Sequence, residues 1–393
     1  MFHKKQISPF GATLRRELAR MKSRPMYFIL TVGIMSFCIM FFISLFNEGQ
    51  LQKMPIGIVD HDNTKISRQF VRNLDATQQA KVVMKPGSYQ EARTEMQKGN
   101  IYAFVEIESG FADKLQSSRR PPLTFYINDA YLTAGSLLLK DITAMSLLTS
   151  GGVQQQTLRA KGVDESLISG IIQPVAVDAH LIGNPWSNYS YYFLNVFFPG
   201  VLEFVILMTT VFVIGIEMKE KTSRKWLRAA NNNFLTALLG KLLPYTAIFI
   251  VWGFVCSIIL YGFLYHPAQD CIFRMLVATV LYVIACQCVG VLIIGILPVL
   301  RDSVSIVMIF GMFGFTFTGF TFPIEQMNYP VRIFSEMYPI RHFFIIYTDQ
   351  VVHGVDFSYS ALYYFILLAY TLLPFLIFFR LKKAAIYQNY PIK

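Results

Sequence analysis

Six long apolar stretches alternate with polar segments along the chain. They cover residues 26–46, 191–216, 242–264, 275–297, 303–322 and 359–379. A helix that crosses a bilayer needs about 20 mostly apolar residues, and each stretch has this length. The backbone must satisfy its own hydrogen bonds in hydrocarbon, so the pattern predicts six membrane helices, TM1 to TM6. Glu203 is the only formal charge inside these stretches.

Composition agrees with this pattern. Hydrophobic residues make up 54% of the chain and charged residues 15%, whereas soluble domains carry about 25% charged residues. These values exclude a disordered chain and a nucleic-acid-binding module. The predicted fold class is therefore a polytopic α-helical membrane protein with six transmembrane helices.

The net charge of +11 is unevenly distributed. Segments 1–25, 217–241 and 380–393 carry most of the Lys and Arg surplus, whereas segment 47–190 holds 14 basic and 14 acidic residues. A Lys and Arg excess marks cytoplasmic loops, so both termini are predicted inside and segment 47–190 outside. Orientation and contact with membrane lipids account for the basic surplus, and no nucleic-acid partner is required.

The basic segment before the first apolar stretch has a helical pattern of its own. Four apolar residues recur at helix spacing: Phe10, Leu14, Leu18 and Met21. Arg16 and Arg20 lie on another face, which is typical of an amphipathic helix at the membrane surface; a basic topogenic tail is the alternative. The apolar stretch that follows is too long for a signal-peptide core and lacks an A-x-A cleavage site, which indicates an uncleaved anchor.

Segment 47–190 is too long to be a simple loop. Short strand patterns at 55–60, 81–84, 101–107 and 123–127 alternate with helix patterns, and a long helical pattern covers 130–159. Alternation of this kind predicts a small α/β extracytoplasmic domain with a stalk helix, inserted between TM1 and TM2. The segment contains no cysteine, metal-ligand spacing or nucleophile–base grouping, so we expect no catalytic or metal-binding residues.

Three features concern the polar segments and the membrane. Segment 217–241 is long for a connection, and it predicts a short cytoplasmic helix that a partner protein could bind. A basic linker that lies on the lipid surface is the alternative. Segment 323–358 is rich in aromatic residues and broken by prolines, which predicts interfacial or re-entrant helices outside. Glu203 is a candidate substrate or interface contact, because an ionisable residue at membrane depth is costly; a carboxylate that is hydrated, or bonded to a neighbouring Tyr or Asn, is the alternative.

Several phrases, taken in order, carry a resemblance to a known family. They are Ile56–Asp60 (IGIVD), Gly110–Leu115 (GFADKL), Glu217–Thr222 (EMKEKT), Leu238–Pro244 (LLGKLLP), Gly319–Ile324 (GFTFPI) and Met337–Ile340 (MYPI). Over essentially its whole length the chain resembles the permease subunits of type-2 ABC exporters, the bacterial kind with a large domain after the first span. It differs at Thr222 and Ser223, where the family usually has Gly-Thr.

The resemblance implies a multi-pass protein of the bacterial plasma (inner) membrane that exports an amphipathic, lipid-like or drug-like substrate. Its implied partners are cytoplasmic ABC ATPase subunits, a second permease that is identical or paralogous, and a periplasmic adaptor. The chain lacks a phosphate-binding Gly-x-x-x-x-Gly-Lys-Ser/Thr loop, so it is no enzyme by itself, and the partner would use the ATP and Mg. The implied ATPase-coupling residues are Glu217, Lys221, Arg224, Lys225, Trp226 and Arg228.

Two other functions compete with this interpretation. An ion-coupled secondary transporter would usually show internal repeats and more intramembrane carboxylates than Glu203 alone. A non-transporting, mechanotransmitting ABC membrane subunit would share every feature above and differ only in moving no cargo.

Overall fold

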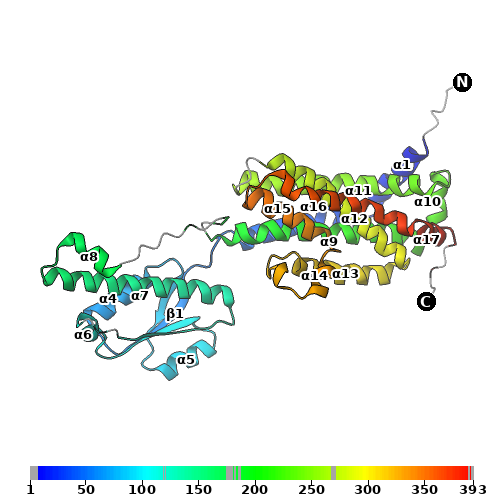
Figure 1. Ribbon diagram of the computed structural model, residues 1–393. Coiled ribbons are helices and arrows are strands. Elements are labelled where there is room, and N and C mark those ends of the chain that lie inside the picture. Colours follow the sequence, from blue (N-terminus) through cyan, green and yellow to red (C-terminus); the bar gives the residue numbers. More distant parts are fainter. Residues whose placement is uncertain are drawn as a thin grey trace. The chain divides into compact units, whose positions relative to one another are not determined.

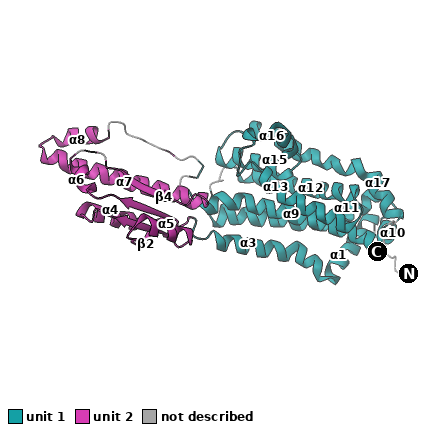
Figure 2. Ribbon diagram, turned by 90° about the horizontal axis from the view of Figure 1, so that it is seen from below, with its two compact units in different colours: residues 1–49, 181–393 teal, residues 50–180 magenta. Residues whose placement is uncertain are grey.

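The computed structural model describes residues 8–117, 119, 121–173, 180, 183–184, 187–266, 271–387 and 390. The chain divides into two compact units. Unit 1 combines residues 1–49 with residues 181–393, and unit 2 contains residues 50–180 (Figure 2). Unit 2 is therefore inserted into the sequence of unit 1.

Unit 1 is helical throughout its described residues. Its N-terminal part holds α1 (Pro9–Ser23) and a helix made of α2 (Pro25–Phe28), η1 (Ile29–Gly33) and α3 (Ile34–Leu45). The later helices are α9 (Tyr189–Lys219), α10 (Ser223–Ala229), α11 (Phe234–Ser257), η2 (Ile258–Phe263), α12 (Ile272–Ile296), α13 (Leu300–Phe317), α16 (Phe357–Ala369), η5 (Tyr370–Leu372) and α17 (Leu373–Tyr387). Figure 1 shows α1, α10 and α17 at the same end of this unit.

Within the described residues, six helices have the length and hydropathy to cross a bilayer. They are Pro25–Leu45, Tyr189–Lys219, Phe234–Phe263, Ile272–Ile296, Leu300–Phe317 and Phe357–Tyr387. This finding confirms the prediction of a polytopic α-helical membrane protein. The second helix is longer than the apolar stretch predicted for it, and it carries Glu217 inside its last turn.

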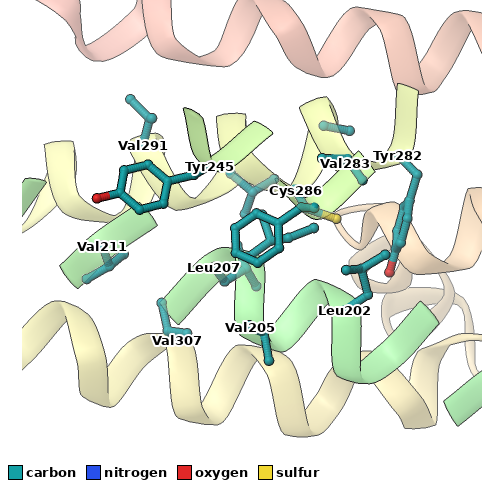
Figure 3. Close-up of a cluster of buried hydrophobic side chains, with 14 of the residues drawn as sticks. Leu202, Val205, Leu207, Val211, Tyr245, Tyr282, Val283, Cys286, Val291 and Val307 are labelled. Carbon is teal, nitrogen blue, oxygen red and sulfur yellow. The ribbon is translucent and has the colours of Figure 1, made fainter. Parts of the chain in front are cut away.

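The core of unit 1 forms around α9 and α12. In the most apolar 18-residue stretch of each of these two helices, 67% is buried inside the protein. The corresponding share in the other four candidate membrane helices is 22–28%. Figure 3 shows side chains from α9, α11, α12 and α13 meeting in this core, among them Leu207, Tyr245, Cys286 and Val307. Apolar residues surround α9 and α12 on all sides, which is the pattern of a helix buried inside a bundle.

Glycines allow several of these helices to approach closely. A Cβ atom added to Gly200 of α9 would lie 2.3 Å from the ring of Phe315 in α13, and one added to Gly253 of α11 would lie 2.3 Å from Thr279 in α12. Small residues at helix contacts are typical of membrane bundles, in which packing replaces the hydrophobic effect as the driving force.

The segment between α13 and α16 contains short helices, as its aromatic and proline pattern predicts. They are η3 (Ile324–Gln326), α14 (Tyr329–Ser335), α15 (Pro339–Tyr347) and η4 (Thr348–Val352). Most side chains of α15 are buried, whereas α14 exposes Tyr329, Ile333 and Phe334. The segment is therefore partly a packed component of the bundle.

Unit 2 contains a four-stranded sheet of order β2-β1-β3-β4. The strands are β1 (Met54–Asp60), β2 (Ala80–Met84), β3 (Ala103–Ile107) and β4 (Leu123–Ile127). They coincide, within two residues at each end, with the predicted strand patterns. β1 pairs in parallel with β2 and β3, and β4 pairs antiparallel with β3.

Helices cover both faces of this sheet. α4 (Lys65–Asp75), α6 (Phe111–Gln116) and α7 (Leu132–Ala160) share one apolar cluster with the strands. α5 (Tyr89–Gln97) packs on the other face through Ala92, and Figure 1 shows α7 and α5 on opposite sides. α8 (Glu165–Ile172) follows α7. The predicted long helix at 130–159 corresponds to α7.

Substitution of Gly200 by Ala should loosen the contact between α9 and α13. The added methyl group would overlap the Phe315 ring, and overpacking of this kind costs about 1–3 kcal/mol. The melting temperature of the detergent-solubilised protein should fall. Gly33→Ala is the matched control, because the nearest atoms around its added Cβ lie at 4.0 Å. Equal melting temperatures of the two variants would show that this close approach does not matter.

Candidate functional site

The connection between α9 and α11 forms a tight corner around α10. Lys221, Asn231 and Asn232 adopt positive φ angles of 56°, 51° and 62° at the two turns that flank α10. Asn accepts this conformation more readily than most residues. Asn233 then caps α11, because its side-chain oxygen accepts hydrogen bonds from the N–H groups of Leu235 and Thr236. Asparagines and a basic residue thus determine where the chain reverses.

α10 has a buried face and an exposed face. Trp226 is 1% exposed, and its Nε1 donates a hydrogen bond of 3.0 Å to the carbonyl of Ala237 in α11. Lys225 and Arg228 lie on the exposed face. Arg224 is also exposed, but its Nε donates to the carbonyl of Ile386 at the end of α17.

A buried lysine lies directly beneath α10. Lys241 is fully buried, and its Nζ lies 2.6 Å from Oε2 of Glu17 and 3.0 Å from Oε1 of Glu217. The hydroxyl of Tyr245 donates a 2.8 Å hydrogen bond to Glu17, and the Lys241 Nζ lies 5.3 Å from the centre of the Trp226 ring. Both carboxylates are buried as well. The lysine therefore joins α1 to the end of α9 through two ion pairs.

Three arginines of α1 and its C-terminal cap extend this cluster toward the surface. Arg16 forms a two-pronged contact with Glu217, with N–O distances of 2.7 and 2.9 Å. Arg20 pairs with both Glu217 and Glu220, and Arg24 pairs with Glu220. The hydrogen bond from Arg24 holds the pKa of Glu220 below its ordinary value. Two-pronged arginine–carboxylate contacts fix orientation as well as distance.

We call Glu17, Glu217, Lys241, Arg16 and Arg20 the corner cluster. Burial of an ion costs several kcal/mol unless partners compensate it, and each buried ion in this set has at least one partner of opposite charge. The positions of α1, α9 and α11 are therefore interdependent at this corner. Displacing one helix would leave a buried charge unpaired.

The polar side of α1 faces the protein. Thr13 and Glu17 are buried, whereas Phe10 is 36% and Leu18 50% exposed. α1 approaches α11 closely at Gly240, where an added Cβ would lie 3.0 Å from the Cβ of Thr13. Phe10 and Leu18 thus remain available to contact lipid, whereas Met21 packs against the bundle core and the polar residues hold α1 on the bundle.

The predicted ATPase-coupling residues separate into two groups. Lys221, Arg224, Lys225 and Arg228 are exposed on or beside α10. Glu217 and Trp226 are instead buried against the protein's own helices, so their coupling role, which stays a prediction, would be exercised behind the exposed surface. Trp226 packs edge-on against the ring of Phe234.

Sequence reasoning missed the role of Glu17, Lys241 and Tyr245. Two signals were present. Glu17 is the only acidic residue among the basic residues before the first span, and Lys241 is a single charge between Gly240 and Leu242 in the apolar run at the start of the third. An isolated charge in an apolar run indicates a buried partner, but nothing in a single sequence identifies that partner.

Glu203 lies inside the bundle. It is 1% exposed, and its Oε2 lies 3.3 Å from the hydroxyl of Tyr282 in α12. The same hydroxyl donates a 2.8 Å hydrogen bond to the carbonyl of Pro199, and the other carboxylate oxygen, Oε1, is buried with no hydrogen-bond partner among the described residues. The contact with a neighbouring tyrosine was one expectation for this residue, and a role as a substrate or interface contact stays a prediction.

Comparison with known protein families gives a match to this chain. A family model described as ABC-2 family transporter protein matches residues 25–380. No curated protein matches the chain. The matched range includes all six candidate membrane helices except the last turns of the sixth, and it includes unit 2 and α10.

Lys241→Met should strongly destabilise unit 1. The substitution leaves Glu17 buried with only Tyr245 as a partner, and breaking a buried ion pair typically costs about 3–5 kcal/mol. Thermal unfolding in detergent should show a lower melting temperature. The double variant Glu17→Gln, Lys241→Met should recover part of the loss, because it removes the unpaired negative charge.

Lys225→Met is the matched control for this series. The same change in side chain takes place on the exposed face of α10, so the melting temperature should hardly move. Equal effects of the substitutions at positions 225 and 241 would contradict the interdependence of the three helices.

Proposed function

This chain belongs to the ABC-2 transporter family, and from that membership we propose that it is the permease subunit of an ATP-driven exporter whose ATPase is a separate polypeptide. The proposed complex contains two ATPase subunits and a second permease, identical or paralogous. Family membership supports the permease role and an ATPase partner. The direction of transport and the cargo are our proposal.

The observation that carries the mechanism is the convergence of helix ends at α10. The corner cluster joins α1, α9 and α11 beside it. The Ser223 hydroxyl of α10 donates to the carbonyl of Ala385, and Arg224 donates to that of Ile386, so α17 is tied to the same corner. α1 leads directly into the first span. A displacement of α10 would therefore be transmitted to four of the six candidate membrane helices described here.

The exposed side of α10 supplies the surface for the ATPase. Lys225 and Arg228, together with Lys221 and Arg224 beside them, present positive charge on this side. Charged groups on a contact surface favour correct encounter and register more than raw affinity. We propose that an acidic groove of the ATPase receives α10, and that closure of the ATPases moves the corner as a unit.

Charge distribution supports the orientation of this mechanism. The corner, α1 and the C-terminal segment carry the Lys and Arg surplus, which favours the cytoplasmic side. Unit 2 is then the extracytoplasmic domain, and a periplasmic adaptor is a candidate partner for it. The membrane is proposed to be the bacterial plasma membrane.

The cargo that fits best is an amphipathic, lipid-like or drug-like molecule. Four of the six candidate membrane helices bury only 22–28% of their most apolar windows, so most of their side chains face lipid or a second permease. A cargo that enters from the bilayer would meet this surface directly. The partly buried α15 beside the exposed α14 would shape the outer end of such a route.

Lys225→Glu combined with Arg228→Glu should abolish coupling without unfolding the chain. Both side chains are exposed and have no ion pair in the described part of the chain, so the melting temperature should stay within about 1 °C, as surface substitutions usually cost little. When the double variant is purified from its native membranes, most of the MgATP hydrolysis that copurifies with the original chain should be lost. Lys81→Glu with Arg93→Glu in unit 2 is the matched control.

The same preparation separates the competing functions. Retained MgATP hydrolysis in the charge-reversed variant would contradict the assignment of α10 as the contact surface. Cargo movement by the isolated chain in vesicles would instead indicate an ion-coupled transporter. ATP hydrolysis that responds to no cargo would indicate a mechanotransmitting subunit.

Glu203→Gln should leave MgATP hydrolysis of the purified complex unchanged. The amide keeps an oxygen that can accept the Tyr282 hydrogen bond, and the volume is nearly the same. Glu203→Ala should lower the melting temperature, because it opens a cavity and removes that acceptor. Loss of hydrolysis in the Gln variant at an unchanged melting temperature would show that the charge itself takes part in transport.

A further inference from the structure

Unit 2 contains a polar hollow that the export mechanism does not use. A cavity of about 340 Å³ lies at the carboxyl ends of β1 and β2. Its polar lining includes Asp60 and Asn63 after β1, Arg68 and Arg72 on α4, and Lys85 after β2. We call it the strand-end pocket.

Chain topology explains why the hollow forms there. β1 and β2 are parallel neighbours, so their carboxyl ends meet at one edge of the sheet. The helix after β1 is α4 and the helix after β2 is α5, and these two helices pack on opposite faces. The two loops therefore diverge and leave a crevice between them. Ligands of open α/β sheets bind in crevices of this kind.

The strand-end pocket carries unbalanced positive charge. Arg68 and Arg72 are one helical turn apart on α4, so their side chains lie on the same face, and Lys85 approaches from the neighbouring loop. None of the three forms an ion pair within the described residues. Arg68 donates only to the carbonyl of Thr64, at 3.1 Å. Like charges at this spacing destabilise a helix, which favours a counter-ion between them.

The carboxylate of the pocket is engaged by its own loop. Oδ1 of Asp60 accepts hydrogen bonds of 3.0 Å from the N–H groups of Asp62 and Asn63, and Oδ2 accepts a 2.8 Å bond from the Ser67 hydroxyl. These contacts hold the turn that leads into α4. Asp60 is therefore a structural element of the loop, and within the described residues it forms no ion pair with any of the three cations.

We propose that the strand-end pocket binds the phosphate group of a small molecule or of a lipid headgroup. The forked donors of Arg68 and Arg72 match the oxygens of a phosphate in pairs, and Lys85 adds a compact charge from the opposite loop. The volume exceeds that of a bare ion and falls at the lower end of small-molecule pockets. The phosphate supplies the missing negative charge.

Calorimetric titration of the full-length chain in detergent tests this site with inorganic phosphate and with glycerol 3-phosphate. Sodium chloride of equal ionic strength is the reference. Binding should saturate, and Arg72→Gln or Lys85→Gln should each weaken it by at least about tenfold, because a hydrogen bond to a charged group contributes at least that factor. Arg93→Gln on α5, exposed and outside the pocket, is the matched control and should bind like the original chain.

A melting measurement distinguishes a binding role from a structural one. In chloride, Arg72→Gln should melt at the same temperature as the original chain or higher, because one of the crowded like charges is gone. In phosphate, the original chain should gain stability and the variant should not. A variant that melts lower in both salts would overturn the proposal, since Arg72 would then stabilise the fold without a ligand.

The source of the phosphate is resolved by comparing soluble and membrane-bound probes. Saturable binding of glycerol 3-phosphate that depends on Arg72 and Lys85 assigns the pocket to a soluble compound. Stabilisation in phosphatidylglycerol nanodiscs relative to phosphatidylcholine nanodiscs, with the same dependence and no soluble binding, assigns it to a lipid headgroup. Absence of any dependence on these two residues in both arms rejects the site.

Discussion

The burial of Lys241 is the constraint on which the arrangement of unit 1 depends. An ammonium group with no exposure requires anionic partners, and Glu17 and Glu217 are the two that reach it. One belongs to a helix that precedes the first span and the other to the last turn of the second. Because the lysine itself lies in the first turns of the third, a single side chain determines how three separate parts of the sequence meet. Arg16 and Arg20 also pair with the second carboxylate, so every buried ion of the group has a partner of opposite charge.

This arrangement joins the helix ends around α10 more firmly than an apolar contact would. Apolar helices in a bilayer exchange protein contacts for lipid contacts at little cost, because lipid tails are as apolar as leucine. Buried ions cannot exchange partners in this way, since each unpaired charge costs several kcal/mol. The ends of α1, α9 and α11, which are joined by buried ion pairs, are therefore expected to move together. The packing of Trp226 on α11 adds α10 to these helix ends and leaves its basic face outside.

The sequence predicted the elements far better than their contacts. Length and hydropathy identified the membrane helices, and alternation of short apolar runs identified the four strands of unit 2, because both signals are local and periodic. The contact between Glu17 and Lys241 joins residues more than 200 positions apart and leaves no periodic trace. The packing of Trp226 against α11 could not be predicted for a related reason. In a helix of seven residues, an aromatic side chain among basic ones fits an exposed contact surface as well as a buried anchor.

Glu203 and Glu217 both belong to α9. They show how the surroundings of a glutamate determine its structural role. Glu217 lies among three cations and joins helices through charge. Glu203 lies among Tyr282, the Ile340 backbone and apolar residues, and has no cation beside it within the described residues. The first holds helices together, because its partners belong to different helices and cannot release it without leaving a charge unpaired. The second meets a neutral hydroxyl on one oxygen and has no partner on the other among the described residues, so it does not join helices through charge.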